Sequence, residues 1–201
     1  MYRSLDEKVK SYQGTYKKFG DDPRSLQYNS KRAASVRYEQ LLADIDVGGK
    51  TILDAGCGFG DLIPFINSKT KSFDYLGIDI MSEFIKVAQK KYPKYKFLTG
   101  DYLGHPLSQK FDVIFCSGSL NSNIIGAESF RRHAIKNLFN HANYALSFNL
   151  AGSYPQPENK QSFRVYYSNS LEILMYCLGL TRKVILRQHY KKKDFTVVMF
   201  K

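Results

Sequence analysis

The sequence predicts an α/β fold with a doubly wound sheet of seven strands, five parallel strands closed by a C-terminal antiparallel hairpin. Short apolar runs alternate with segments whose apolar residues recur at helical spacing, which is typical of a parallel sheet with crossover helices. The last two apolar runs, 184–188 and 195–200, are separated only by residues 189–194. That connection is too short for a crossover helix, so the two runs are expected to pair antiparallel.

The elements are expected to alternate in chain order from residue 30. A helix over about 30–45 leads into a strand at 50–55, and a glycine-rich turn connects this strand to a helix that contains residues 62–66. Pro64 falls in the first turn of that helix, where a missing N–H costs no hydrogen bond. Further strands are expected at 73–80, 95–98, 111–117 and 144–150, and further helices at 82–91, 128–141 and about 170–180.

Length and composition indicate one globular domain. The chain has 201 residues and 43% hydrophobic residues, enough to bury a core without disulfides. We expect the domain to span residues 31–201, after an N-terminal extension at 1–30 with a short helix and a loop. No apolar run is long enough for a membrane helix, and the charged N-terminus does not resemble a signal peptide, which predicts no membrane contact and a cytoplasmic location.

The cysteines, the histidines and the net charge indicate which metals and macromolecules the protein is expected to bind. Cys57, Cys116 and Cys177 are far apart and odd in number, which predicts reduced, packed cysteines. Neither they nor the histidines have metal-ligand spacing, so we predict no metal. The net charge of +12 favours a polyanionic partner, but the lysines are scattered over separate segments. Nucleic acid therefore stays one possible partner.

The turn after the first strand, TILDAGCGFG, carries Gly56, Gly58 and Gly60. Without Cβ atoms, these residues allow a ligand to approach the backbone; a tight turn without a ligand is the alternative. The spacing is GxGxG, and Asp61 stands where dinucleotide-binding turns carry their last glycine. A carboxylate at a helix N-terminus repels phosphate, which disfavours NAD or FAD, whereas a cofactor with a sulfonium and an ammonium group tolerates it. Asp54 is positioned to accept a hydrogen bond from or through that ammonium group.

Two more carboxylates follow the next two strands. Asp79, at the end of LGIDI, is expected to accept both ribose hydroxyls of an adenosine, and Asp101 the adenine amino group. Ile80 and Met81 are expected to cover the adenine face. Each carboxylate alone would be more typical of a cap or a solvated charge. Together they lie at successive strand ends, where open α/β sheets bind ligands.

The segments DAGCGFGDL, LGIDI, GDYL and FDVIFCSGSLN together resemble the signature segments of the class I S-adenosylmethionine-dependent methyltransferases, over residues 50–122. The resemblance implies a Rossmann-like fold, S-adenosylmethionine as cofactor in the roles above, and Cys57, Tyr102 and Ser117 as further cofactor contacts. The terminal hairpin is also a trait of that family. SFNL and the segment VILRQHYKKKDFTVVMF resemble bacterial members without an assigned substrate.

One departure from the family's motifs excludes some classes of methyl acceptor from the prediction. Enzymes that methylate amino groups of bases commonly carry an (N/D)PP(Y/F) segment after the fourth strand, whereas this chain has Ser117-Gly118-Ser119-Leu120-Asn121. This disfavours N-methylation of adenine or cytosine, and the absence of a Pro-Cys pair there disfavours methylation of cytosine C5. Asn121 is expected to contact the acceptor.

The acceptor side is less well defined by the sequence. Four aromatic residues of the N-terminal extension are expected to form a lid and to line the acceptor pocket, with a packed cap as the alternative: Tyr12, Tyr16, Phe19 and Tyr28. Arg37 is expected either to pair with the cofactor carboxylate or to lie on a solvated helix face. His133, His141 and His189 are candidates for a base, although none is assigned that role.

The predicted function is therefore methyl transfer from S-adenosylmethionine to a small-molecule acceptor. One alternative is an RNA or other nucleic-acid methyltransferase, supported by the positive charge. Another is a non-catalytic S-adenosylmethionine-binding subunit.

Overall fold

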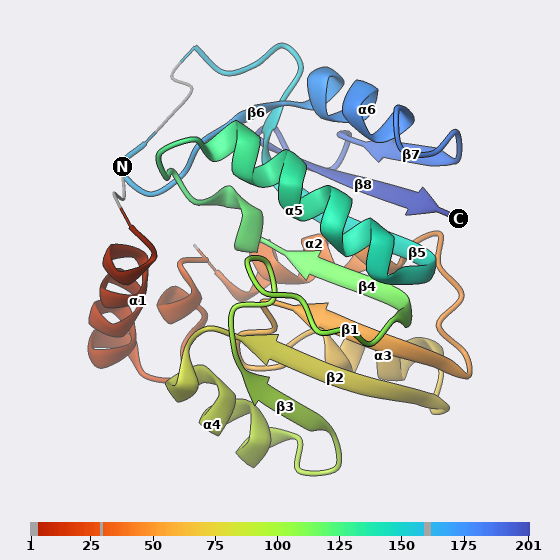
Figure 1. Cartoon of the computed structure of the whole chain (residues 1–201). Helices are drawn as coiled ribbons and strands as arrows, with labels where there is room; N and C mark the ends of the chain where they lie inside the picture. Colours follow the sequence, from red (N-terminus) through yellow and green to blue (C-terminus); the bar gives the residue numbers. More distant parts are fainter. Residues whose placement is uncertain (1–3, 29, 159–161) are drawn as a thin grey trace.

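The computed structural model describes residues 4–28, 30–158 and 162–201. The strands are β1 Lys50–Ala55, β2 Phe73–Asp79, β3 Lys96–Thr99, β4 Phe111–Ser117, β5 Ala142–Ser153, β6 Ser168–Asn169, β7 Val184–Arg187 and β8 Asp194–Phe200. They form one sheet in the order β3-β2-β1-β4-β5-β8-β7, with β6 beside the end of β5 (Figure 1). β1 to β5 run parallel, and β8 pairs antiparallel with both β5 and β7. The predicted fold class is confirmed.

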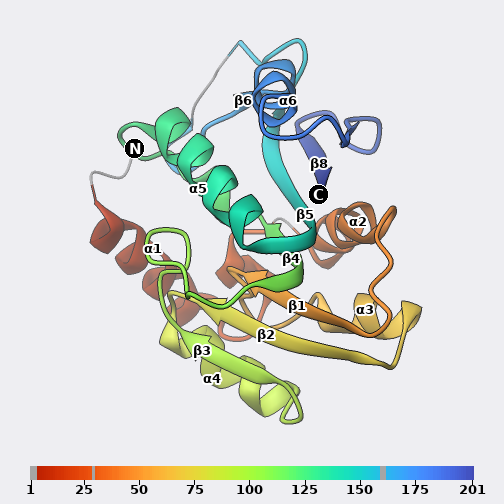
Figure 2. The same cartoon turned by 45° about the vertical axis from the view of Figure 1, so that its right-hand side comes forward.

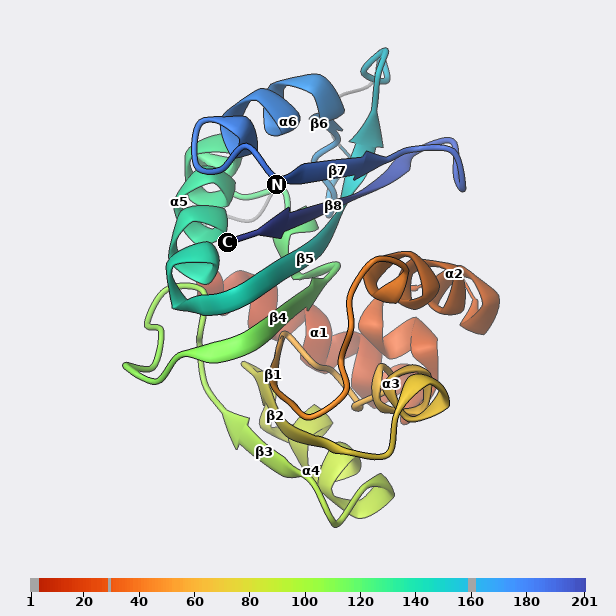
Figure 3. The same ribbon diagram turned by 90° about the vertical axis from the view of Figure 1, so that its right-hand side faces the viewer.

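Helices cover both faces of the sheet. The helices are α1 Leu5–Phe19, α2 Lys31–Leu42, α3 Ile63–Lys69, α4 Ser82–Lys91, α5 Ala127–His141 and α6 Ser170–Leu178, with short 3-10 turns η1 Pro23–Leu26 and η2 Ser119–Asn121. α2, α3 and α4 bury residues such as Leu41 and Ile66 against one face, and α5 and α6 bury Leu138 and Cys177 against the other (Figure 3). α4 lies along β2 and β3 at the edge of the sheet (Figure 2).

The structure adds strand residues that the hydrophobic pattern did not predict. β5 extends beyond the expected 144–150 at both ends, and its last two residues pair in parallel with β6. Gly152 permits that pairing: its φ is 148°, and a Cβ there would lie 2.0 Å from the Ser168 carbonyl oxygen. A two-residue strand has no recognisable alternation of apolar and polar residues, so the sequence could not predict it.

The N-terminal helix α1 is longer than the short helix expected. Ser4 caps it by accepting a hydrogen bond from the Glu7 N–H at 3.2 Å, and acidic residues in the first turn and lysines in the last turn complement the helix dipole. α1 lies at the carboxyl ends of the parallel strands (Figure 1). Together with η1 it packs on a separate apolar cluster centred on Phe59 and Phe84, to which it contributes Val9, Tyr12, Tyr16 and Leu26.

The three cysteines are buried free thiols, which confirms their packing role. Burial raises the pKa of the Cys116 thiol to about 12, so it stays protonated near neutral pH. Among the described helices, none is long and apolar enough to cross a membrane.

Candidate cofactor and acceptor site

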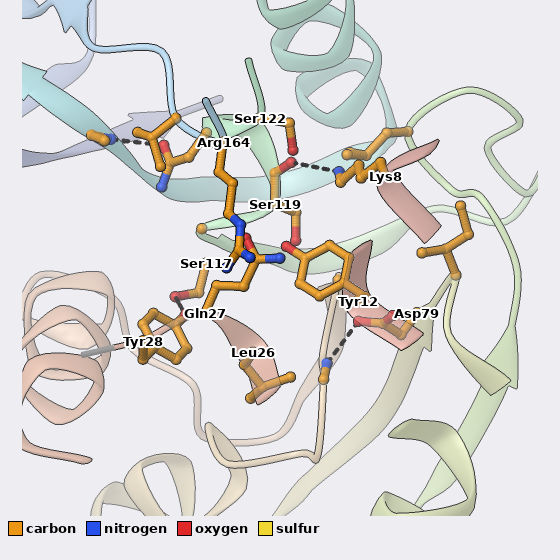
Figure 4. A pocket seen from close by; sticks show the side chains of 18 of the residues that line it. Lys8, Tyr12, Leu26, Gln27, Tyr28, Asp79, Ser117, Ser119, Ser122 and Arg164 are labelled. Atoms are coloured by element: carbon orange, nitrogen blue, oxygen red, sulfur yellow. Dashed lines mark hydrogen bonds between the residues drawn. The ribbon is translucent and has the colours of Figure 1, made fainter. Parts of the chain in front are cut away.

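A cavity of about 650 Å³ opens where the parallel strands end, between the sheet and the N-terminal segment. Loops after β1, β2, β3 and β4 form its floor, while α1 and η1 contribute Lys8, Tyr12 and Leu26 to its walls (Figure 4). A cavity of this size suits a cofactor and a small ligand. Its position is the crevice at which open α/β sheets bind ligands.

The glycine turn brings backbone to the cavity surface. Gly56 and Gly58 line the cavity with Cys57, and both glycines have positive φ values, 82° and 54°. A Cβ on Gly56 would lie 1.8 Å from the Ser119 Oγ, and one on Gly58 would lie 2.9 Å from a methyl carbon of Leu26. Both positions therefore require glycine on conformational and steric grounds. Gly60 also has a positive φ, 76°, but it packs towards Phe97 in the core and is not a lining residue.

Asp79 stands at the centre of the predicted cofactor half of the cavity. Its carboxylate accepts hydrogen bonds from the N–H groups of Gly58 and Met81, each at 2.9 Å. Burial raises the pKa of this carboxyl, while the two N–H donors oppose that rise. A carboxylate has room for further donors, so Asp79 can still receive ribose hydroxyls. Ile80 lines the cavity, whereas Met81 is buried and supports the turn through its backbone.

Asp101 and Tyr102 form the next part of the wall. Asp101 lines the cavity and accepts a hydrogen bond from the Gly104 N–H at 3.1 Å. The Tyr102 hydroxyl is buried and has no hydrogen-bond partner among the described residues. Burial raises its pKa to about 12, so it remains a donor at neutral pH. An unpaired buried hydroxyl is costly. The Tyr102 ring packs edge-on against His141 at the end of α5, with ring centroids 6.3 Å apart, so its side chain belongs to the core beneath α5.

Asp54 lies behind the glycine turn and does not line the cavity. Its buried carboxylate accepts a hydrogen bond from the Tyr75 hydroxyl at 2.9 Å. Burial raises the pKa of Asp54 to about 7, against the opposing effect of the Tyr75 hydrogen bond. An interaction with the cofactor ammonium would therefore have to pass through the turn, and its predicted role stays a prediction.

At the end of β4, a hydrogen-bond network fixes Ser117 and Gly118. The Ser117 hydroxyl shares a hydrogen bond with the Tyr28 hydroxyl at 3.2 Å and accepts one from the Asn149 side-chain amide at 3.3 Å. The Asn149 carboxamide oxygen accepts from the Gly118 N–H at 2.9 Å. Ser117 and Asn121 both line the cavity, and the Asn121 oxygen accepts from the Ala151 N–H at 2.7 Å. Asn149 lies in the SFNL segment, but the sequence assigned it no role, because an asparagine in a buried strand has the same local sequence whether or not it supports a site.

The four N-terminal aromatic residues divide into two pairs. Tyr12 and Tyr28 line the cavity. Tyr16 instead packs against Phe84, with ring centroids 5.8 Å apart, and Phe19 contacts the Arg24 guanidinium, 4.6 Å from the ring centroid. Neither Tyr16 nor Phe19 is a lining residue, so direct acceptor contact by these two stays a prediction without support from the geometry.

Two basic residues of the N-terminal helices face the cavity: Lys8, which the sequence did not single out, and Arg37, which it did. Lys8, on α1, is nearly buried, and its ammonium group donates to the Ser119 carbonyl at 3.4 Å. Burial lowers its pKa, while the negative charge of Asp79 opposes that change. Arg37 lines the cavity and donates to both carboxylate oxygens of Asp194, at 2.7 and 2.9 Å. The Arg37 guanidinium is thus already paired with a carboxylate of the same chain, and its pairing with the cofactor carboxylate stays a prediction.

Histidine does not contribute to the cavity lining in the described part of the chain. His133 and His141 bond within α5 through Asn137, and His189 packs beside Tyr190. The described residues also contain no cluster of three or more His, Cys, Asp or Glu side chains that could hold a metal ion.

The glycine turn, the carboxylates at the strand ends and the order of the sheet are together those of a Rossmann-like methyltransferase fold. Residues 52–143 match the family model of a methyltransferase domain. The predicted resemblance to class I S-adenosylmethionine-dependent methyltransferases is thereby confirmed over this region.

Curated relatives align with the same region. Protein 235L of Invertebrate iridescent virus 6 is 36% identical over 70 residues, covering 33% of this chain and 26% of that protein. The phthiotriol/phenolphthiotriol dimycocerosates methyltransferase of Mycobacterium tuberculosis is 28% identical over 97 residues, covering 47% of this chain and 36% of that protein. The chain thus spans about a quarter to a third of the length of these relatives.

Solved structures share the fold over nearly the whole chain. The magnesium protoporphyrin IX methyltransferase of Synechocystis PCC 6803 with bound SAH superposes with a TM-score of 0.69 at 17% identity, covering 98% of this chain and 100% of that chain. The DhpI–SAH complex superposes with a TM-score of 0.68 at 12% identity, covering 96% of this chain and 94% of that chain. At these identities the similarity shows the fold alone.

Proposed function

We propose that this protein transfers a methyl group from S-adenosylmethionine to a small-molecule acceptor. The observation that carries the proposal is the cavity of about 650 Å³, in which Gly56, Asp79 and Asp101 form one part and the N-terminal segment forms an outer wall. The space enclosed by this wall has room for a compact molecule beside the cofactor. The relatives named above support the proposal, because their names specify phthiotriol dimycocerosates and magnesium protoporphyrin IX as acceptors.

The residues of the chain fit the cofactor in separate roles. Asp79 would hold the ribose, the backbone of the glycine turn would approach the amino-acid part, and Tyr102 and Asp101 would receive the adenine. When bound, S-adenosylmethionine supplies an electrophilic methyl group. The protein's contribution is to hold the acceptor in line with it and to exclude water, for which Tyr12 and Tyr28 are placed on the cavity wall.

The test is transfer of labelled methyl groups from S-adenosylmethionine to two separate pools, a low-molecular-weight metabolite extract and total RNA. We expect label in the metabolite pool and much less with Asp79→Ala. Label confined to RNA would support the alternative of a nucleic-acid methyltransferase, which the net charge of +12 favours. Cofactor binding without transfer to either pool would support a non-catalytic subunit. Location in the cytoplasm and the absence of a metal stay predictions from the sequence.

A further inference from the structure

Positive charge is concentrated in one half of the cavity. The half next to β2 and β3 carries the carboxylates of Asp79 and Asp101, and Lys8 lies between this half and the end of β4, where its ammonium group donates to the Ser119 carbonyl. Among the residues that the structure describes, the other half, at the ends of β4, β5 and β8, carries one carboxylate and four cations. We call this part of the cavity the acceptor half. Its charged residues are Arg37, Arg164, Lys191, Lys193 and Asp194.

The carboxylate of Asp194 neutralises only part of the positive charge in the acceptor half. It is nearly buried and already bonds the Arg37 guanidinium at 2.7 Å and the Lys191 ammonium at 2.8 Å. Arg164 and Lys193 have no carboxylate within 4.0 Å among the residues that the structure describes. The Lys193 ammonium instead lies 5.4 Å from the ring centroid of Tyr167.

Arg164 is held so that it faces the cavity. Its backbone carbonyl accepts a hydrogen bond from the Asn123 N–H at 2.9 Å, which ties the loop between β5 and β6 to the segment after η2. The side chain extends into the middle of the cavity, towards Gln27 (Figure 4). A guanidinium group presents paired N–H donors that match carboxylate or phosphate oxygens.

The cofactor itself does not explain these cations. In S-adenosylmethionine the sulfonium and ammonium groups outweigh the single carboxylate, so further positive charge beside it is unfavourable unless an anion lies between. Arg164 and Lys193 are themselves exposed to solvent at the cavity surface. Cations gathered in a concave surface attract anions, and the effect grows where no internal carboxylate neutralises them.

Building on the proposed function, we propose that the acceptor is an anionic small molecule whose carboxylate or phosphate group is bound by Arg164 and Lys193. Tyr28 and Tyr167 would provide aromatic walls beside it, since both line the same half of the cavity. The anionic group is a recognition group and stays ionised while another atom of the acceptor faces the methyl donor.

Calorimetric titration tests the proposal with defined probes. S-adenosylhomocysteine is titrated first, and the complex is then titrated with benzoate, phenyl phosphate and the neutral benzamide. We expect at least one anion to bind tenfold or more tightly than benzamide, and comparison of the two anions distinguishes a carboxylate from a phosphate. Arg164→Ala and Lys193→Ala should each weaken that anion about tenfold and leave S-adenosylhomocysteine binding unchanged.

Matched controls separate local recognition from net charge. Arg182→Ala and Lys192→Ala remove the same charges from exposed residues outside the cavity and should leave the anion affinity unchanged. Equal affinity for benzamide and both anions, no anion binding to the complex, or equal losses in all four variants would overturn the proposal. If S-adenosylhomocysteine itself does not bind, the proposed function fails, and this inference fails with it.

Discussion

Asp79 combines two tasks at one carboxylate. It fixes the glycine turn through the Gly58 N–H at 2.9 Å, and it faces the cavity where the ribose is expected. Replacing it therefore affects both the shape of the turn and the ligand.

We expect Asp79→Ala to weaken S-adenosylmethionine binding by about 1.5–3 kcal/mol, the scale of hydrogen bonds to a charged group. Asp79→Asn keeps an acceptor oxygen for the turn and should lose less. Calorimetry measures both affinities, and circular dichroism checks that both variants are folded. Unchanged affinity in a folded Asp79→Ala protein would refute the ribose assignment.

The buried carboxyl group of Asp54 makes the free energy of unfolding depend on pH. Its pKa is about 7 in the folded protein, above the ordinary carboxyl value, so folding favours the protonated form. The resulting stabilisation is present below about pH 4 and is lost as the pH rises through 7. Asp54→Asn cannot ionise, so its free energy of unfolding relative to wild type should rise by about 2–3 kcal/mol between pH 5 and 8. Urea unfolding at several pH values measures this difference, and parallel pH curves for the two proteins would contradict it.

The predicted site and the observed cavity agree where backbone and motif determine position. Asp79, Asp101 and the turn glycines follow strands of strong pattern, so their place at the strand ends was predictable. The positions of Lys8 and Arg164 were not predictable. A lysine on a polar helix and an arginine in a loop have the same local sequence whether they face solvent or a ligand. Only the tertiary packing of α1 and of the β5–β6 loop brings them to the cavity.

At the scale of elements, Gly14 would be a pivot of the N-terminal lid if α1 bent there, but α1 is continuous through this residue. A Cβ on Gly14 would meet no atom within 4 Å. Gly14→Ala should therefore stabilise the protein by about 0.5–1 kcal/mol, since alanine favours the helix. Gly56→Ala is the contrasting variant and should destabilise it by about 1–3 kcal/mol because of its positive φ and the Ser119 contact. Chemical denaturation measures both. Loss of turnover with Gly14→Ala would restore the pivot hypothesis.

The N-terminal segment is predicted to act as a lid over the cavity. Deleting residues 1–28 keeps Ser30, which caps α2 by accepting from the Ala33 N–H at 3.1 Å. The sheet should persist in far-ultraviolet circular dichroism, because its strands all follow residue 49. The melting temperature should fall, since Phe59 and Phe84 lose their cover, and turnover should collapse as the site opens to water. Full turnover by the truncated, folded protein would show that the segment is a structural cap.

Most elements were predictable because burial and hydrophobic pattern agree. β1, β4 and α4 have the predicted bounds, and α2 begins after its Ser30 cap. β6 and the ends of β5 depend on pairing between distant segments, which no local pattern encodes. The length of α1 was underestimated although Ser4 and Glu7 carry a capping signal, because its apolar residues contact only one small cluster.

At the scale of the molecule, the net charge of +12 is divided between exposed lysines and the acceptor half of the cavity. Scattered exposed charges predict only weak, salt-dependent attraction to polyanions. The cavity charges line one ligand-sized space, and in the proposal above they recognise one anionic group.

The most direct test of the account is calorimetric titration of the intact protein with S-adenosylmethionine and with NAD under identical conditions. The GxGxG turn and the carboxylate of Asp79 predict saturable binding of S-adenosylmethionine with one site per chain, and no heat from NAD. Binding of NAD without binding of S-adenosylmethionine would contradict it.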